Sequence, residues 1–128
     1  MSESSAAVHT AEDQSEVIAF LSEGAEHVET HAAHVFLKGD VALKLKKAVK
    51  LPYLDFSTRS RRKAAIEQEL MINRGFAPEL YLDVKPVIRS AAGMLKLGGR
   101  GRTLDWVLRM KRFPPHSLLS DLIARGRS

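Results

Sequence analysis

The 128-residue chain, 45% hydrophobic and 27% charged, has the length and composition of one globular domain, which excludes a wholly disordered chain. It has no cysteine, no apolar run of the roughly 18 residues that cross a membrane and no recognisable signal peptide, so we expect a cytoplasmic protein without disulfides or membrane contact. The net charge of +5 divides into −7 over residues 1–40 and +12 over residues 41–128, which favours an anionic partner.

Hydrophobic periodicity and turn residues predict the elements of the first half of the chain. Gly24 ends a helical pattern, Lys38-Gly39-Asp40 has the composition of a hairpin turn, and Pro52 disfavours helix in the residue before it. In chain order, the predicted elements are a disordered tail (1–13), a short helix (16–21), a strand (27–30), a hairpin of two strands (34–37 and 41–45) and a loop (51–56).

The second half predicts one long helix followed by strands. Ser57 or Thr58 can cap this helix, Gly75 can stop it, and Pro114-Pro115 breaks the last strand. The predicted elements are a helix (58–74), a strand (81–88), a flexible turn (98–101), a second strand (103–110) and a short final helix (117–123). The inner side of the long helix should be marked by Ala65, Ile66, Leu70 and either Ile72 or Asn73. This order predicts an α+β fold in which a twisted antiparallel sheet has the long helix packed on one face.

The run Val41-Ala42-Leu43-Lys44 suggests a nucleotide site. On a strand, Ala42 and Lys44 share a face, so the small side chain could lie against an adenine while the ammonium reaches its phosphates. Protein kinases use V-A-I-K on their third strand in this way. The alternative is an amphipathic strand with a lysine-rich solvent face, since more lysines follow.

Two further patterns are compatible with such a site. A glutamate of the long helix, Glu67 or Glu69, could pair with Lys44 and aim it at phosphate, although either could equally be a surface carboxylate. The strand that runs into residues 110–113 and then Pro114 could offer unpaired backbone groups to an adenine edge, or could be an ordinary edge strand.

Several short runs together resemble the start of the bacterial aminoglycoside-phosphotransferase-like proteins, over about residues 25–125. The runs are Lys38-Gly39-Asp40, Lys44–Val49, Leu54-Asp55-Phe56-Ser57-Thr58, Glu69–Arg74 with Ala77-Pro78 and Tyr81-Leu82, and Asp105-Trp106-Val107 with Met110–Phe113. The resemblance implies a kinase-like N-terminal lobe of about five strands, with one long αC-type helix and short flanking helices. It also implies that ATP is bound by Ala42, Lys44, Glu69 and a hinge that contains Met110, Lys111 and Arg112, with Glu67 as second choice for the partner of Lys44.

The chain departs from this family after the hinge. It has no His-x-Asp loop, so we expect residues 14–128 to be the lobe through the hinge, without the C-terminal lobe that carries the catalytic and metal-binding aspartates. We therefore assign no catalytic and no metal-binding residue, and expect Mg²⁺ to act only if a C-terminal lobe is supplied. The surface around residues 106–113 and 118–123 should then be an exposed apolar patch that invites self-association or a partner chain.

Two other kinds of site have less support. His27, His31 and His34 have helical spacing, but in strand and loop His27 and His31 should face away from His34, which disfavours a zinc site. Arg59–Lys63 is a basic helix start without interleaved aromatic residues, which disfavours nucleic acid and indicates acidic or phosphate groups nearby.

The sequence therefore predicts the ATP-binding lobe of a small-molecule kinase that is inactive by itself and binds ATP weakly. The alternatives are a degenerate, non-enzymatic binding protein and a basic nucleic-acid-binding domain. A rise in melting temperature with ATP favours the kinase interpretation, whereas a steep loss of DNA affinity with salt favours the nucleic-acid-binding domain.

Overall fold

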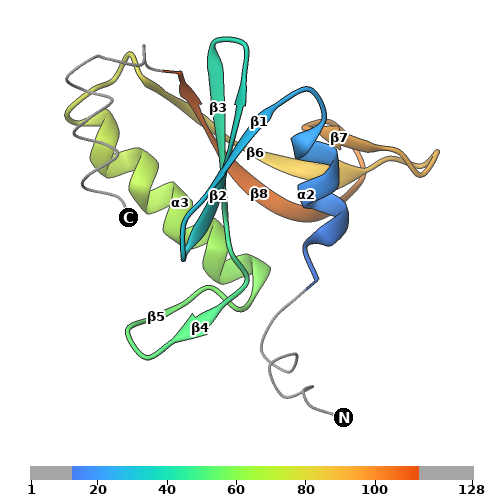
Figure 1. Ribbon diagram of the computed structural model, residues 1–128, viewed down its shortest axis with the longest axis horizontal. Helices are drawn as coiled ribbons and strands as arrows, with labels where there is room; N and C mark the ends of the chain where they lie inside the picture. Colours follow the sequence, from blue (N-terminus) through green and yellow to red (C-terminus); the bar gives the residue numbers. More distant parts are fainter. Residues whose placement is uncertain (1–12, 113–128) are drawn as a thin grey trace.

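A computed structural model describes residues 13–112 of the chain, as an α+β fold (Figure 1). Within these residues the helices are α2 (Ser15–Ser22) and α3 (Arg59–Arg74). The strands are β1 (Glu26–Glu29), β2 (Ala33–Lys38), β3 (Val41–Lys46), β4 (Lys50–Leu51), β5 (Leu54–Asp55), β6 (Tyr81–Arg89), β7 (Leu95–Leu97) and β8 (Arg102–Lys111).

Six of the strands form one antiparallel sheet in the order β1-β2-β3-β8-β6-β7. β1, β2 and β3 are joined in sequence by two hairpin connections, and the strand that pairs with the other edge of β3 is β8. β3 and β8 therefore form the centre of the sheet. The tight β2–β3 connection is made by Gly39 and Asp40, and Gly39 has φ +56°, which glycine adopts without a steric cost. This arrangement confirms the antiparallel sheet and the predicted hairpin.

The two faces of the sheet pack against different helices. Leu43 and Leu45 of β3 belong to a cluster that includes Val17 and Leu21 of α2. Ala42, which alternates with them, packs instead with Ile66 of α3 in a second cluster. Because side chains alternate along a strand, β3 contributes to both cores, and α2 and α3 lie on opposite sides of the sheet (Figure 1).

Helix α3 begins at the predicted cap. The Thr58 side chain accepts a hydrogen bond from the Arg61 amide, which satisfies one of the unpaired donors of the first turn. The helix ends at Arg74, but Gly75 has φ −63° and ψ −27°, so it stays in the right-handed region rather than forming a left-handed stop. Its amide bonds to the carbonyl of Ile72, which tightens the last turn.

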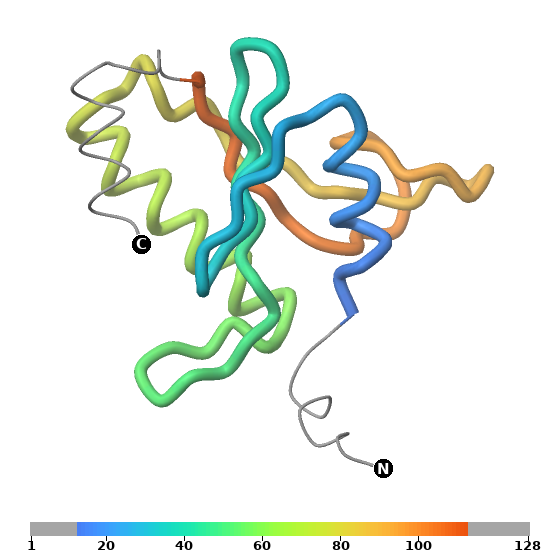
Figure 2. Tube along the Cα trace, in the orientation of Figure 1, coloured from blue at the N-terminus to red at the C-terminus, as the bar shows by residue number. Residues whose placement is uncertain are grey.

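The structure corrects two details of the predicted fold and decides between two residues that the sequence left as alternatives. Within the described residues the main sheet has six strands rather than about five, because β7 forms at Leu95–Leu97, just before the predicted turn at 98–101, where no strand was predicted. Residues 51–56 do not form a simple loop: β4 and β5 pair around Pro52-Tyr53 as a small hairpin beyond the main sheet (Figure 2). Ile72 is exposed, so Asn73 rather than Ile72 lies on the inner side of α3.

Two predicted segments fall outside the described residues: the final helix at 117–123, and the tail at 1–13 except for Asp13. Within the part of the chain that the structure describes, neither helix is long and apolar enough to cross a membrane.

Candidate functional site

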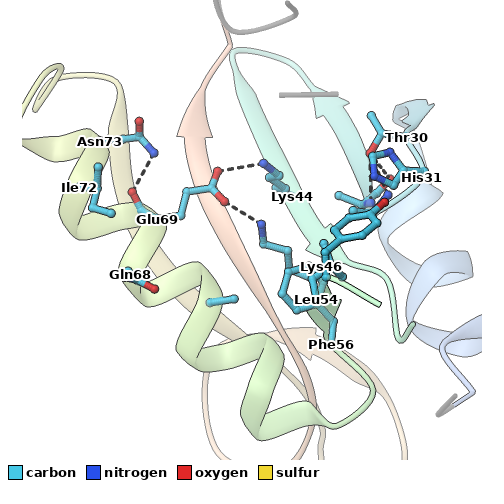
Figure 3. A pocket seen from close by; sticks show the side chains of 14 residues that line it. Thr30, His31, Lys44, Lys46, Leu54, Phe56, Gln68, Glu69, Ile72 and Asn73 are labelled. Carbon is cyan, nitrogen blue, oxygen red and sulfur yellow. Dashed lines mark hydrogen bonds and ion pairs between the residues drawn. The ribbon is translucent and has the colours of Figure 1, made fainter. Parts of the chain in front are cut away.

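The centre of the candidate site is an ion pair between β3 and α3. The Nζ of Lys44 lies 2.9 Å from the Oε2 of Glu69, and each side chain is only 9% exposed (Figure 3). The predicted contact of Lys44 with Glu69 is therefore confirmed. Glu67, the second choice, points to solvent and lies 3.8 Å from Lys63 in the same helix.

Lys46 is a second cation at this carboxylate, and the sequence patterns did not single it out. Its Nζ lies 2.8 Å from the other oxygen of Glu69, and its side chain is 13% exposed. The ammonium also lies 5.2 Å from the centre of the Phe56 ring. The available signal was strand periodicity, since Lys46 follows Lys44 by two residues and must share its face. Two ammonium groups thus share the Glu69 carboxylate.

These residues line a cavity of about 740 Å³. Figure 3 shows the Glu69 carboxylate between the two lysines, with side chains from the β1–β2 turn on the far side of the space. The walls come from that turn and β2 (Thr30, His31, Ala32, Ala33), the β4–β5 region (Tyr53, Leu54, Phe56) and α3 (Ala65, Gln68, Ile72, Asn73), in addition to Lys44, Lys46 and Glu69. The volume falls within the usual range for small-molecule sites.

The predicted adenine-binding residues lie elsewhere. Ala42 and Met110 are neighbours across β3 and β8, but both are buried in the α3-side core and neither lines the cavity. The backbone amides of Lys111 and Arg112 already donate to the carbonyls of Leu80 and Asp40. The structure thus brings Lys44 and Glu69 together in the cavity wall and leaves Ala42 and residues 110–112 outside it; their role in binding ATP stays a prediction.

The prediction of an exposed apolar patch is wrong for residues 106–112, the part of the patch that the structure describes. Val107, Leu108 and Met110 are buried, because β8 is a central strand that contributes to both cores, and Trp106 is half-buried against the α3-side cluster. Phe113 and residues 118–123 lie outside the described residues.

A deeply buried ion pair joins α3 to β8. The Nε of Arg62 lies 3.1 Å from the Oδ1 of Asp105, and the two side chains are 1% and 2% exposed. Gln14 completes the group: its amide nitrogen donates to the other oxygen of Asp105, and its amide oxygen accepts from the Ala48 amide. The basic helix start was expected to lie near acidic groups, and Arg62 and Arg61 both do. The sequence did not predict that Arg62 would be buried and would attach α3 to β8.

The histidines of the first strands are arranged differently from the prediction. His27 and His34 were expected to face opposite ways, but β1 pairs with β2 in a register that puts them on one face. The Nε2 of His27 lies 2.9 Å from the Nδ1 of His34. The error came from counting along one strand when the two residues lie on neighbouring strands. Burial lowers the pKa of His34, which favours the neutral imidazole.

Comparison with known proteins finds similar segments in longer chains. The chain is 30% identical over 98 residues to uncharacterized proteins of Mycobacterium bovis and Mycobacterium tuberculosis. The match covers 77% of this chain but 18% of each relative, so the chain spans less than a fifth of the length of these relatives. No family model matches the chain, and no solved structure matches it.

Proposed function

We propose that the described residues are the ATP-binding lobe of a small-molecule kinase similar to the aminoglycoside phosphotransferases. The observation that carries the proposal is the shielded ion pair of Lys44 with Glu69 in the wall of a cavity large enough for a small molecule. A strand lysine held by a helix glutamate is the device with which kinase-like folds aim an ammonium at the phosphates of ATP.

The chemistry of the cavity fits an anionic ligand. Glu69 holds two ammonium groups at 2.8 and 2.9 Å, so Lys44 and Lys46 are already ordered before a ligand arrives and lose little further conformational freedom on binding. Two ammonium groups in one wall attract the phosphates of such a ligand. In this proposal Lys44 binds the α- and β-phosphates and Lys46 extends the same positive surface.

Phosphoryl transfer to a hydroxyl group would require a second lobe. That lobe would supply the aspartate that orients the hydroxyl and the carboxylates that hold Mg²⁺, which neutralises charge on the phosphates. The matched 98 residues make up only 18% of the mycobacterial relatives, which leaves length for such a lobe in proteins of that size. For residues 1–128 alone we expect ATP affinity in the millimolar range, about 4 kcal/mol of binding free energy.

The test is ATP binding by calorimetry with purified residues 1–128 and two lysine variants. Lys44→Met should weaken ATP binding roughly tenfold, the usual order for losing a charged phosphate contact. Lys63→Met is the matched control, because Lys63 forms a more exposed pair with Glu67 and lies outside the cavity. Its ATP affinity should equal that of the unmodified chain.

AMP provides a second comparison. Because the lysines are proposed to contact the phosphates, ATP should bind more tightly than AMP, and Lys44→Met should reduce that difference. Circular dichroism confirms that each variant is folded. Equal losses in Lys44→Met and Lys63→Met, or equal affinities for ATP and AMP, would show that the cavity is not a nucleotide phosphate site.

A further inference from the structure

The face of the sheet that carries α2 holds a cluster of metal-ligand side chains at its β1 edge. His27 and Glu29 are two residues apart on β1, and His34 lies directly across from Glu29 on β2. One ligand atom from each of these three residues lies within 4.8 Å of the other two. Because the ligands come from paired strands, their backbones are held together before any ion binds, which is what a preorganised site needs.

We infer that His27, Glu29 and His34 form a binding site for a transition-metal ion such as Zn²⁺. Two imidazoles and one carboxylate are a ligand set that Zn²⁺ takes in proteins, with a water in the fourth position. With metal–ligand bonds of about 2.0–2.1 Å, tetrahedral ligand atoms lie roughly 3.3 Å apart. The two imidazole nitrogens are 2.9 Å apart and need to separate by only a few tenths of an ångström.

The surroundings fit a site that is half open. His34 is 8% exposed, whereas His27 and Glu29 are exposed, so an ion can enter from solvent and keep a water ligand. The His27 ring stacks on the buried Phe36, with 4.7 Å between ring centres, which holds the ring beside His34. Imidazole ligands favour Zn²⁺ and similar ions over Mg²⁺.

Lys47 competes with the ion. Its ammonium lies 2.5 Å from the Oε2 of Glu29, and it must give up that contact when the Glu29 carboxylate binds a metal. This competition gives a distinctive prediction. Lys47→Met keeps the apolar stem but removes the charge, so it should make Zn²⁺ binding tighter.

The site is separate from the proposed nucleotide cavity. None of the three ligand residues lines that cavity, although the intervening turn does. A bound ion would therefore link β1 to β2 without occupying the phosphate site. ATP binding and metal binding can each fail without the other.

The experiment is a calorimetric titration of residues 1–128, prepared without a histidine tag, with ZnCl₂. We expect one Zn²⁺ per chain and a raised melting temperature, with no such effect from MgCl₂. His27→Ala and Glu29→Gln should each weaken binding roughly tenfold or more. Both residues are exposed, so these variants should fold even if a His34 variant does not.

His31→Ala is the matched control, because His31 lies in the same hairpin but is not one of the three proposed ligands. It should bind Zn²⁺ like the unmodified chain, while Lys47→Met binds it more tightly. The inference is overturned if His27→Ala binds Zn²⁺ as well as the unmodified chain, or if His31→Ala loses as much affinity as His27→Ala. It is also overturned if Lys47→Met binds Zn²⁺ more weakly.

Discussion

Single residues decide how α3 is attached to the sheet. Arg62 and Asp105 lose nearly all contact with water, and such burial is costly unless each charge is paired and its hydrogen bonds are satisfied. Arg62 also donates to the carbonyl of Phe56, and Asp105 accepts from the amide of Trp106. The pair thus connects the segment before α3, the helix itself and the central strand β8.

Removing one charge of this pair should destabilise the protein strongly. Asp105→Asn takes away the carboxylate charge beside the buried Arg62 guanidinium, at a cost of about 3–5 kcal/mol in the free energy of unfolding. Urea denaturation measures this loss. Arg61→Ala is the control, since Arg61 is 59% exposed and 3.5 Å from Asp55, and should change stability by less than about 0.5 kcal/mol. Similar losses in both variants would contradict the structural role of the buried pair.

An ion pair between β8 and β6 should make stability depend on pH. Arg109 donates two hydrogen bonds of 2.8 Å to the Asp83 carboxylate, which lowers the pKa of Asp83 from its ordinary value of 3.8. A carboxyl group with a lower pKa in the folded state contributes stability above its unfolded pKa, and this contribution is lost as pH falls through the folded pKa. Because both side chains are about one-third exposed, the contribution of this pair to the free energy of unfolding should be below about 1 kcal/mol.

Urea midpoints measured from pH 7 down to pH 2 test this contribution. Asp83→Asn removes the titrating group, so its stability should fall less steeply than that of the unmodified chain below about pH 4. Parallel pH profiles for the two proteins would show that the pair contributes nothing measurable.

At the scale of elements, α3 and β3 bring the candidate site together. α3 carries Glu69 and β3 carries Lys44, so the ion pair depends on the helix extending through its third and fourth turns. Short-range signals define this helix well: a threonine cap at its start and a run without glycine or proline for 16 residues.

Removing the cap should weaken α3. Thr58→Ala leaves the Arg61 amide without its side-chain acceptor, and should cost about 1 kcal/mol in the free energy of unfolding. Gln68→Ala truncates an exposed polar side chain farther along the same helix, away from the cap, and should be close to neutral. Urea denaturation of both variants checks the prediction, and equal losses would show that the Thr58 hydroxyl is not the cap.

At the scale of the whole molecule, the sheet order predicts where the backbone opens first. β3 and β8 each have a strand on both sides, whereas β1 and β7 are edge strands of this sheet. β1 is also exposed along its length, so little apolar packing opposes its opening.

Hydrogen–deuterium exchange should therefore be slowest in residues 41–46 and 103–110 and fastest among the strands in β1 and β7. Mass spectrometry of peptides from each strand measures these rates. Protection of β1 or β7 equal to that of β3 would contradict the strand order.

The sequence alone was enough to place most elements and one contact of the candidate site. The 3.6-residue period of α3, the glycine turn before β3 and the alternation of Ala42 with Leu43 are local signals that act within a few residues. The contact of Lys44 with Glu69 followed from strand periodicity joined to the family resemblance. β4, β5 and β7 were missed because strands of two or three residues have too few positions to show a period.

Only the tertiary structure decided which distant residues meet. β8 pairs with β3 across more than 60 residues, and no local pattern specifies that partner. The same holds for Arg62 with Asp105, where a basic helix start gives no sign that one of its charges is buried. It holds also for His27 with His34, because the register between β1 and β2, rather than spacing along the chain, sets which side chains share a face. Long-range pairing is a property of the whole folded sheet, so these contacts were not visible in any one segment of sequence.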